Sequence, residues 1–203
     1  MNILNLKKKT LITAFITSLL FVACGKDDAT KPNTNNAPFT FLKVGNEWEH
    51  GRYDVDTDTL RNIYKLKVVS ENNGYFKVIQ NNNEDSYNYY FIDDNGWYIN
   101  KTESEIGATF ILPLNCYVGK MWDETYNDYG VLYTIIYEIV SVSETVIVPA
   151  GTIKNCIKVK TQQIAEYEGE VFEKDPYYSY YHKDIGMVIV PGKGWMKLYS
   201  KNF

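Results

Sequence analysis

The hydrophobic pattern of residues 38–203 repeats at every second position along most of the chain. Tyr64, Leu66 and Val68 alternate with Lys65, and the same spacing recurs in later segments. Side chains two residues apart lie on the same face of a strand, so this period predicts β-strands rather than helices. The predicted strands, separated by turn residues, cover 47–55, 60–70, 75–81, 86–92, 96–101, 108–112, 131–142, 144–148, 152–163, 170–182, 186–190 and 195–200.

The segment 131–140 bears most directly on the kind of sheet. Its spacing also fits a helix, but its β-branched and aromatic residues favour a strand. Ile135 and Ile136 are adjacent and both apolar, which indicates a strand that is covered on both faces. We therefore predict one all-β domain, residues 38–203, built as an antiparallel, strongly curled sheet in the form of a half-barrel or open barrel. A two-sheet β-sandwich is the alternative.

The first 23 residues have the layout of a secretory signal. Three lysines, Lys7 to Lys9, precede an uncharged run from Leu11 to Val22 and the small residue Ala23. Phe21-Val22-Ala23-Cys24 resembles a bacterial lipobox, in which the cysteine is lipidated after the preceding peptide is removed. We expect 1–23 to be a lipoprotein signal peptide and Cys24 to carry the lipid that anchors the protein to a membrane. A plain signal peptide with a chance cysteine is the alternative.

Residues 24–37 have the composition of a tether. From Ala29 to Pro38, two prolines and several asparagines replace any apolar period, so we expect this segment to lack secondary structure. Gly25-Lys26-Asp27-Asp28 resembles a short acidic signal that directs lipoproteins to the cell surface, and a solvated charge cluster is the alternative. Loss of residues 1–23 moves the net charge from −4 to −7. An acidic surface disfavours nucleic acid as a partner.

The composition argues against catalysis. The chain has 18 Tyr but only two His, and it lacks the common nucleophile, metalloprotease and phosphate-binding motifs. We expect His50 and His182 to be hydrogen-bonded strand residues. The sequence therefore predicts a protein without enzyme activity, cofactor or metal site.

Three alternating aspartates, Asp54, Asp56 and Asp58, resemble the start of a calcium-binding loop. Thr59 stands where such a loop needs glycine, so the match fails. We expect an exposed acidic face on a strand, with weak surface binding of calcium as the alternative.

The tyrosines suggest two roles. Tyr90, Tyr98, Tyr178 and Tyr180 share one parity and would form an exposed platform for stacking on sugar rings. Packing in the core and between neighbouring strands is the alternative.

Two cysteines remain once Cys24 is lipidated. In an oxidising compartment Cys116 and Cys156 form either a disulfide or two free thiols, and sequence alone does not decide between them. Cys156 falls among lysines of alternating spacing, where a buried residue is not expected.

Five blocks carry a family resemblance: Leu42–Trp48, Leu112–Leu114, Val118–Asp123, Val146–Val159 and Tyr180–Val188. They resemble successive motifs of exported lipoproteins of unknown function that are called TapB-like, and Val148-Pro149-Ala150-Gly151-Thr152 is the most specific part. The resemblance implies an antiparallel, curled sheet similar to the half-barrel of periplasmic lipoprotein carriers, and no catalytic residues.

Taken together, these features predict an outer-membrane lipoprotein, lipid-anchored and at the cell surface or facing the periplasm. We expect it to act as a non-catalytic interaction or accessory module with an envelope protein as partner. Two alternatives remain open: a glycan-binding surface protein, and a carrier of an apolar, lipid-like ligand in the concave face of the sheet.

Overall fold

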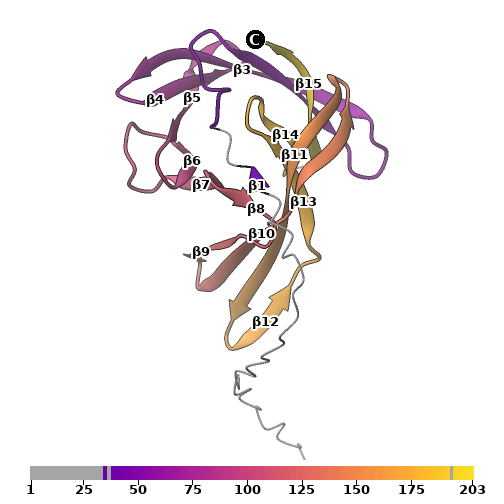
Figure 1. The fold of residues 1–203 in the computed structure, drawn as a ribbon. Helices are drawn as coiled ribbons and strands as arrows, with labels where there is room; N and C mark the ends of the chain where they lie inside the picture. Colours follow the sequence, from indigo (N-terminus) through magenta and orange to yellow (C-terminus); the bar gives the residue numbers. More distant parts are fainter. Residues whose placement is uncertain (1–33, 36–37, 193) are drawn as a thin grey trace, which may run out of the picture. The chain divides into compact units, whose positions relative to one another are not determined.

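The computed structural model describes residues 34–35, 38–192 and 194–203, which all belong to one compact unit that runs from Pro32 to Phe203. These residues form strands and no helix (Figure 1). The first strands are β1 (Thr34–Asn35), β2 (Glu47–Tyr53), β3 (Leu60–Asn72), β4 (Tyr75–Gln80), β5 (Asn83–Ile92), β6 (Gly96–Asn100), β7 (Thr109–Pro113) and β8 (Cys116–Tyr117). The others are β9 (Met121–Asp128), β10 (Val131–Val148), β11 (Gly151–Tyr167), β12 (Glu170–Glu173), β13 (Tyr177–His182), β14 (Gly186–Gly192) and β15 (Gly194–Asn202).

Within this part of the chain, one antiparallel sheet of 13 strands contains all strands except β1 and β8. Its order is β7-β6-β5-β4-β3-β2-β15-β14-β13-β11-β10-β9, and β12 pairs with β11. The C-terminal strand β15 thus pairs with β2, which joins the two ends of the chain in the middle of the sheet. The prediction of an all-β, antiparallel sheet that is not closed into a barrel is confirmed, and the two-sheet sandwich is not formed.

The core lies on one face of this curled sheet. Buried side chains from strands far apart in the sheet order, including Val68 of β3, Leu112 of β7, Ile139 of β10 and Val188 of β14, belong to one hydrophobic cluster. One sheet brings such distant strands around a common core only by curving over itself, as Figure 1 shows. The curl follows from the right-handed twist of strands together with bulges in the long hairpin β10–β11.

The two edges of the sheet approach each other through side chains. Phe110 of β7 and Trp122 of β9 make an edge-to-face contact, with ring centroids 5.7 Å apart. Between these edges in sequence, β8 pairs with β1 in a small separate sheet. Within the described residues no ladder of hydrogen bonds joins β7 to β9, and the edges meet through side-chain packing such as this ring contact.

The segment that precedes β2 supplies part of the core. Phe39, Phe41 and Leu42 are all buried, and the amide of Thr40 donates to the carbonyl oxygen of Lys183 at 2.9 Å. These residues lie against the concave face of the sheet, because Phe41 contacts both Trp48 and Trp97.

Most strand boundaries agree with the periodicity, but several expectations are wrong, and the short strand β8 was not expected either. Residues 131–148 form one strand, β10, rather than two, and residues 170–182 form two strands, β12 and β13. Strand β9 was not expected, because its side chains are mainly polar and exposed. In the segment expected to be a tether, Thr34–Asn35 form β1, which pairs with Cys116–Tyr117. The remainder of residues 24–37 lies outside the described residues.

A bulge explains the burial of Cys156. Ile153 pairs with Val146 and Cys156 with Glu144, so β11 has one more residue than β10 between these pairs. Asn155, at φ 58°, absorbs the extra residue in the left-handed region that asparagine tolerates. The side chain of Cys156 therefore turns to the core, and the expectation from its lysine neighbours is wrong.

Candidate functional site

The platform of four tyrosines predicted from sequence is not formed. Tyr90 is only 4% exposed and packs against Trp97, with ring centroids 5.8 Å apart. Tyr98 lies on the opposite face of the sheet, where it stacks on Phe91 at 4.9 Å. The register of the β5–β6 hairpin pairs Phe91 with Tyr98, so equal parity in the two strands does not mean a common face. This expectation is therefore wrong for Tyr90.

The other two tyrosines of that set lie on β13. The Nζ atom of Lys158 lies 4.6 Å from the ring centroid of Tyr178 and 5.7 Å from that of Tyr180. These are cation–π contacts within the protein, between side chains that the pairing of β13 with β11 brings together.

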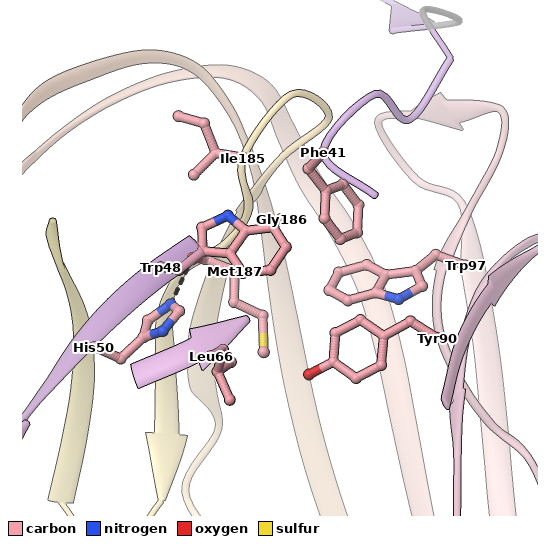
Figure 2. A pocket seen from close by; sticks show the side chains of 9 residues that line it. All are labelled: Phe41, Trp48, His50, Leu66, Tyr90, Trp97, Ile185, Gly186 and Met187. Carbon is pink, nitrogen blue, oxygen red and sulfur yellow. Dashed lines mark hydrogen bonds between the residues drawn. The ribbon is translucent and has the colours of Figure 1, made fainter. Parts of the chain in front are cut away.

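The largest fully buried side chains surround a small cavity on the concave face (Figure 2). Its lining consists of Phe41, Trp48, His50, Leu66, Tyr90, Trp97, Ile185, Gly186 and Met187. The cavity has a volume of about 10 Å³, which is room for one water molecule at most. The chain's own aromatic residues therefore fill this part of the interior.

His50 is the most deeply buried titratable group of that lining. Its Nε2 atom donates to the carbonyl oxygen of Met187 at 3.0 Å, and Nδ1 is buried without a hydrogen-bond partner among the described residues. Burial lowers the pKa of His50, so the ring is neutral near pH 7. The ring joins β2 to β14 and has no carboxylate or nucleophile among its recorded partners. His182 is also hydrogen-bonded, since its Nδ1 accepts from the amide of Asp184 at 3.1 Å.

Lys183 is a second buried polar group. It is 2% exposed, its Nζ donates to the carbonyl oxygen of Leu114 at 2.6 Å, and it lies 5.0 Å from the ring centroid of Phe39. Burial lowers the pKa of this ammonium group. These contacts tie the turn after β13 to the segment before β8, which is a structural role.

Both remaining cysteines are buried free thiols in the structure. The Sγ atom of Cys116 donates to the carbonyl oxygen of Pro113 at 3.1 Å, and that of Cys156 to Ile153 at 3.7 Å. Burial raises the pKa of Cys116 to about 11 and that of Cys156 to about 12. Of the two alternatives from sequence, the structure has the pair of thiols, and both are protonated and unreactive in this state.

The aspartates of residues 54–58 form a turn between β2 and β3 rather than a strand face. The carboxylate of Asp54 accepts from Arg61 Nη2 at 2.8 Å and from the amides of Asp56 and Thr57, which lowers the pKa of Asp54 to about 2. The expected acidic strand face is therefore wrong. Across the described residues no group of His, Cys, Asp or Glu side chains is arranged to hold a metal ion.

A different aromatic surface extends beyond the core along β9, β10, β11 and β12. Directly opposed residues of antiparallel strands share a face, and the register places Tyr126, Tyr133, Ala165 and Phe172 in one row across these four strands. Tyr126 and Phe172 are 46% and 55% exposed. The rings of Tyr126 and Tyr133 stack, with centroids 5.1 Å apart and planes 19° from parallel.

Two further rows complete this surface, which we call the hairpin face. The next row is Glu124, Ile135 and Gln163, and the row nearest the core is Trp122, Tyr137, Thr161 and Tyr177. Trp122 and Tyr137 stack at 5.2 Å. Further along β10 and β11 the same face contributes Ile139 and Val159 to the core. The alternation in β10 indicated these residues, but only the pairing of β9 and β12 with the hairpin shows that they form one surface.

The comparisons with known proteins add little to this geometry. No family model matches the chain, and none of the curated proteins matches it. Among solved structures, a protein of Bacteroides fragilis, inferred to be exported and described as having a YmcC-like fold, matches with a TM-score of 0.41 and 19% identity. The match covers 82% of this chain and 100% of the other. At this level of similarity it carries no information on what this chain binds.

The predicted lipidation site, Cys24, and the acidic motif that follows it lie outside the described residues. The described part of the chain contains no helix with the length and apolar character needed to span a bilayer.

Proposed function

We propose that this protein is an exported, lipid-anchored module that binds a partner through its surface and performs no catalysis. The observation that carries the proposal is the contrast between a filled interior and an open aromatic surface. Phe41 and its neighbours leave a cavity of about 10 Å³ on the concave side, whereas Tyr126 and Phe172 of the hairpin face are about half exposed.

The filled interior disfavours a carrier of an apolar ligand. A site that encloses a ligand of drug size or larger needs roughly 300 Å³ or more. The cavity beside Trp97 is far smaller, and widening it would displace residues that belong to the core. A role at the surface therefore fits the geometry better than transport of an acyl chain.

Export and anchoring are supported by the sequence of residues 1–28. The charged, apolar and small-residue order before Cys24 supports a lipoprotein signal, and the likeness of five blocks to TapB-like lipoproteins agrees with it. The acidic motif Gly25-Lys26-Asp27-Asp28 supports the cell surface as the final location, at the outer membrane.

Metabolic labelling with a palmitate analogue tests the anchor. The wild type should be labelled and Cys24→Ala should not, whereas the matched variant Cys116→Ala keeps the label because its thiol is buried in the domain. Equal labelling of all three proteins would contradict the anchor. Protease added to intact cells should remove the domain, and complete protection would place it on the periplasmic side instead.

A further inference from the structure

The hairpin face combines exposed rings with hydrogen-bonding groups in separate rows. We propose that this face binds a neutral saccharide chain, with sugar rings against the outer aromatic row and hydroxyl groups on Glu124 and Gln163. The inference rests on the proposed function, because it names the ligand class of the same binding surface.

The outer row of the hairpin face is the one farthest from the core, Tyr126, Tyr133, Ala165 and Phe172, and its aromatic rings are interrupted by the small residue Ala165. Ala165 stands between Tyr133 and Phe172, and neighbouring strands are about 4.8 Å apart. The methyl side chain of Ala165 therefore leaves a shallow space flanked by two aromatic rings. The C–H groups on one side of a sugar ring are attracted to the electron-rich face of an aromatic ring. The row crosses four strands and has exposed rings at both ends, so an extended chain of sugars covers it better than a single ring.

The polar row offers both an acceptor and a donor. Glu124 is half-buried, and its Oε1 atom is covered without a hydrogen-bond partner among the described residues, so a ligand must use the part of the carboxyl group that remains exposed. Gln163 uses its Oε1 to accept from Lys174 Nζ at 3.1 Å, so its amide nitrogen is the group it can offer to a ligand. A hydroxyl group donates and accepts, so the hydroxyls of a sugar chain that lies across this row suit both residues.

Other ligand chemistries fit these rows less well. An apolar ligand would bury the carboxyl group of Glu124 without a partner, which is costly. An organic cation would meet the ammonium group of Lys174 beside Gln163. An anion would meet Glu124 on a mature chain whose net charge is −7.

The opposite face of the same strands provides a matched control. Leu132 and Val171 both pair with Glu166 and are 39% and 61% exposed. They occupy the same strands as Tyr133 and Phe172 but point to the other side. Their loss removes a comparable exposed apolar area without touching the hairpin face.

The test uses the whole mature chain, purified in detergent, with a panel of soluble polysaccharides: α-glucan, β-glucan, xylan, mannan and galactan. Affinity gel electrophoresis should show retardation by at least one of them. The double variant Tyr126→Ala and Phe172→Ala should weaken binding at least tenfold, while Leu132→Ala with Val171→Ala stays within twofold of the wild type. Glu124→Gln should weaken binding at least fivefold without lowering the Tm, which separates a ligand contact from a role in folding.

Three results would overturn the inference: no retardation by any member of the panel, equal loss in the variants of both faces, or unchanged binding in Glu124→Gln. If no polysaccharide retards the protein, and a photoreactive residue at position 172 cross-links to another protein, then the hairpin face binds a protein and not a saccharide. The proposed function would still stand. Failure of the proposed function is detected by a different experiment, in which the wild type and Cys24→Ala would be labelled equally by the palmitate analogue.

Discussion

Phe41 packs edge-on against Trp97, with ring centroids 4.7 Å apart and ring planes at 68°. Phe41 precedes the first strand of the main sheet, whereas Trp97 lies on β6 near one of its edges. The contact therefore fixes the segment before β2 inside the curl of the sheet. Gly186 leaves room for it, since a Cβ atom there would lie 3.1 Å from the Phe41 ring.

The variant Phe41→Ala should lower the free energy of unfolding by about 3–5 kcal/mol. The side chain of Phe41 is only 1% exposed, so its truncation opens a cavity in the core. Urea unfolding followed by tryptophan fluorescence measures the loss. Val44→Ala, in the same segment but 50% exposed, is the control and should change stability by about 0.5 kcal/mol or less. A loss below about 1 kcal/mol for Phe41→Ala would contradict the filled interior.

The stability of the domain should fall as the pH drops below the ordinary histidine value of 6.5. Burial lowers the pKa of His50, so the unfolded chain binds the proton more tightly than the folded one. The contribution of His50 to the free energy of unfolding is fully present above pH 6.5. It declines as the pH falls towards the pKa of the folded state, by at most about 1.4 kcal/mol per pH unit.

Unfolding curves of wild type and His50→Gln between pH 7 and pH 5 test this dependence, and the variant should have the shallower slope. His182→Gln is the comparison, because burial lowers the pKa of that residue as well but its side chain is 18% exposed. Identical slopes in the wild type and His50→Gln would show that the ring is accessible to protons in the folded state.

The thiols of Cys116 and Cys156 should resist alkylation in the folded state and react fully once the chain unfolds. Both side chains are 0% exposed, and their raised pKa values keep them protonated at neutral pH. Intact mass after iodoacetamide, measured in the Cys24→Ala background without reductant, should show no addition in buffer and two in denaturant. Absence of both additions in denaturant would mean that the two residues form a disulfide.

The bulge at Asn155 gives a prediction about backbone strain. Asn155→Ala should destabilise the domain by about 1–2 kcal/mol, because alanine is disfavoured at φ 58°, whereas Asn155→Gly should be neutral or stabilising. Lys154→Ala, exposed on the same hairpin, is the control and should have little effect. Thermal unfolding of the three variants separates the backbone effect from loss of a side-chain contact, and equal Tm values for the alanine and glycine variants at position 155 would contradict it.

Alternation of apolar and polar residues was enough to predict the class of the fold. Most strands between residues 47 and 200 were located from it, because a side chain's position on a strand face depends only on its neighbours along the chain. Strand β9 escaped this reasoning, since an edge strand with exposed polar residues carries little apolar alternation. Strand β1 was not predicted for another reason, because its pairing with β8 is a long-range contact.

The candidate site depended on information that no local pattern contains. Tyr90 and Tyr98 share a parity in sequence, yet the register of β5 with β6 sends them to opposite faces. Tyr133 and Phe172 lie far apart in the chain, yet β11 brings them into one row. Likewise, the extra residue at Asn155 reverses the direction of Cys156.

The sequence by itself determined that this chain is a β protein, and it gave the expectation of a signal and an anchor at the N-terminus, because strand period and signal layout are local properties of the residues. Tertiary structure alone decided that Phe41 occupies the interior and that the hairpin face is assembled from five strands. Those outcomes depend on register and curl, and both are set by contacts between residues distant in the chain.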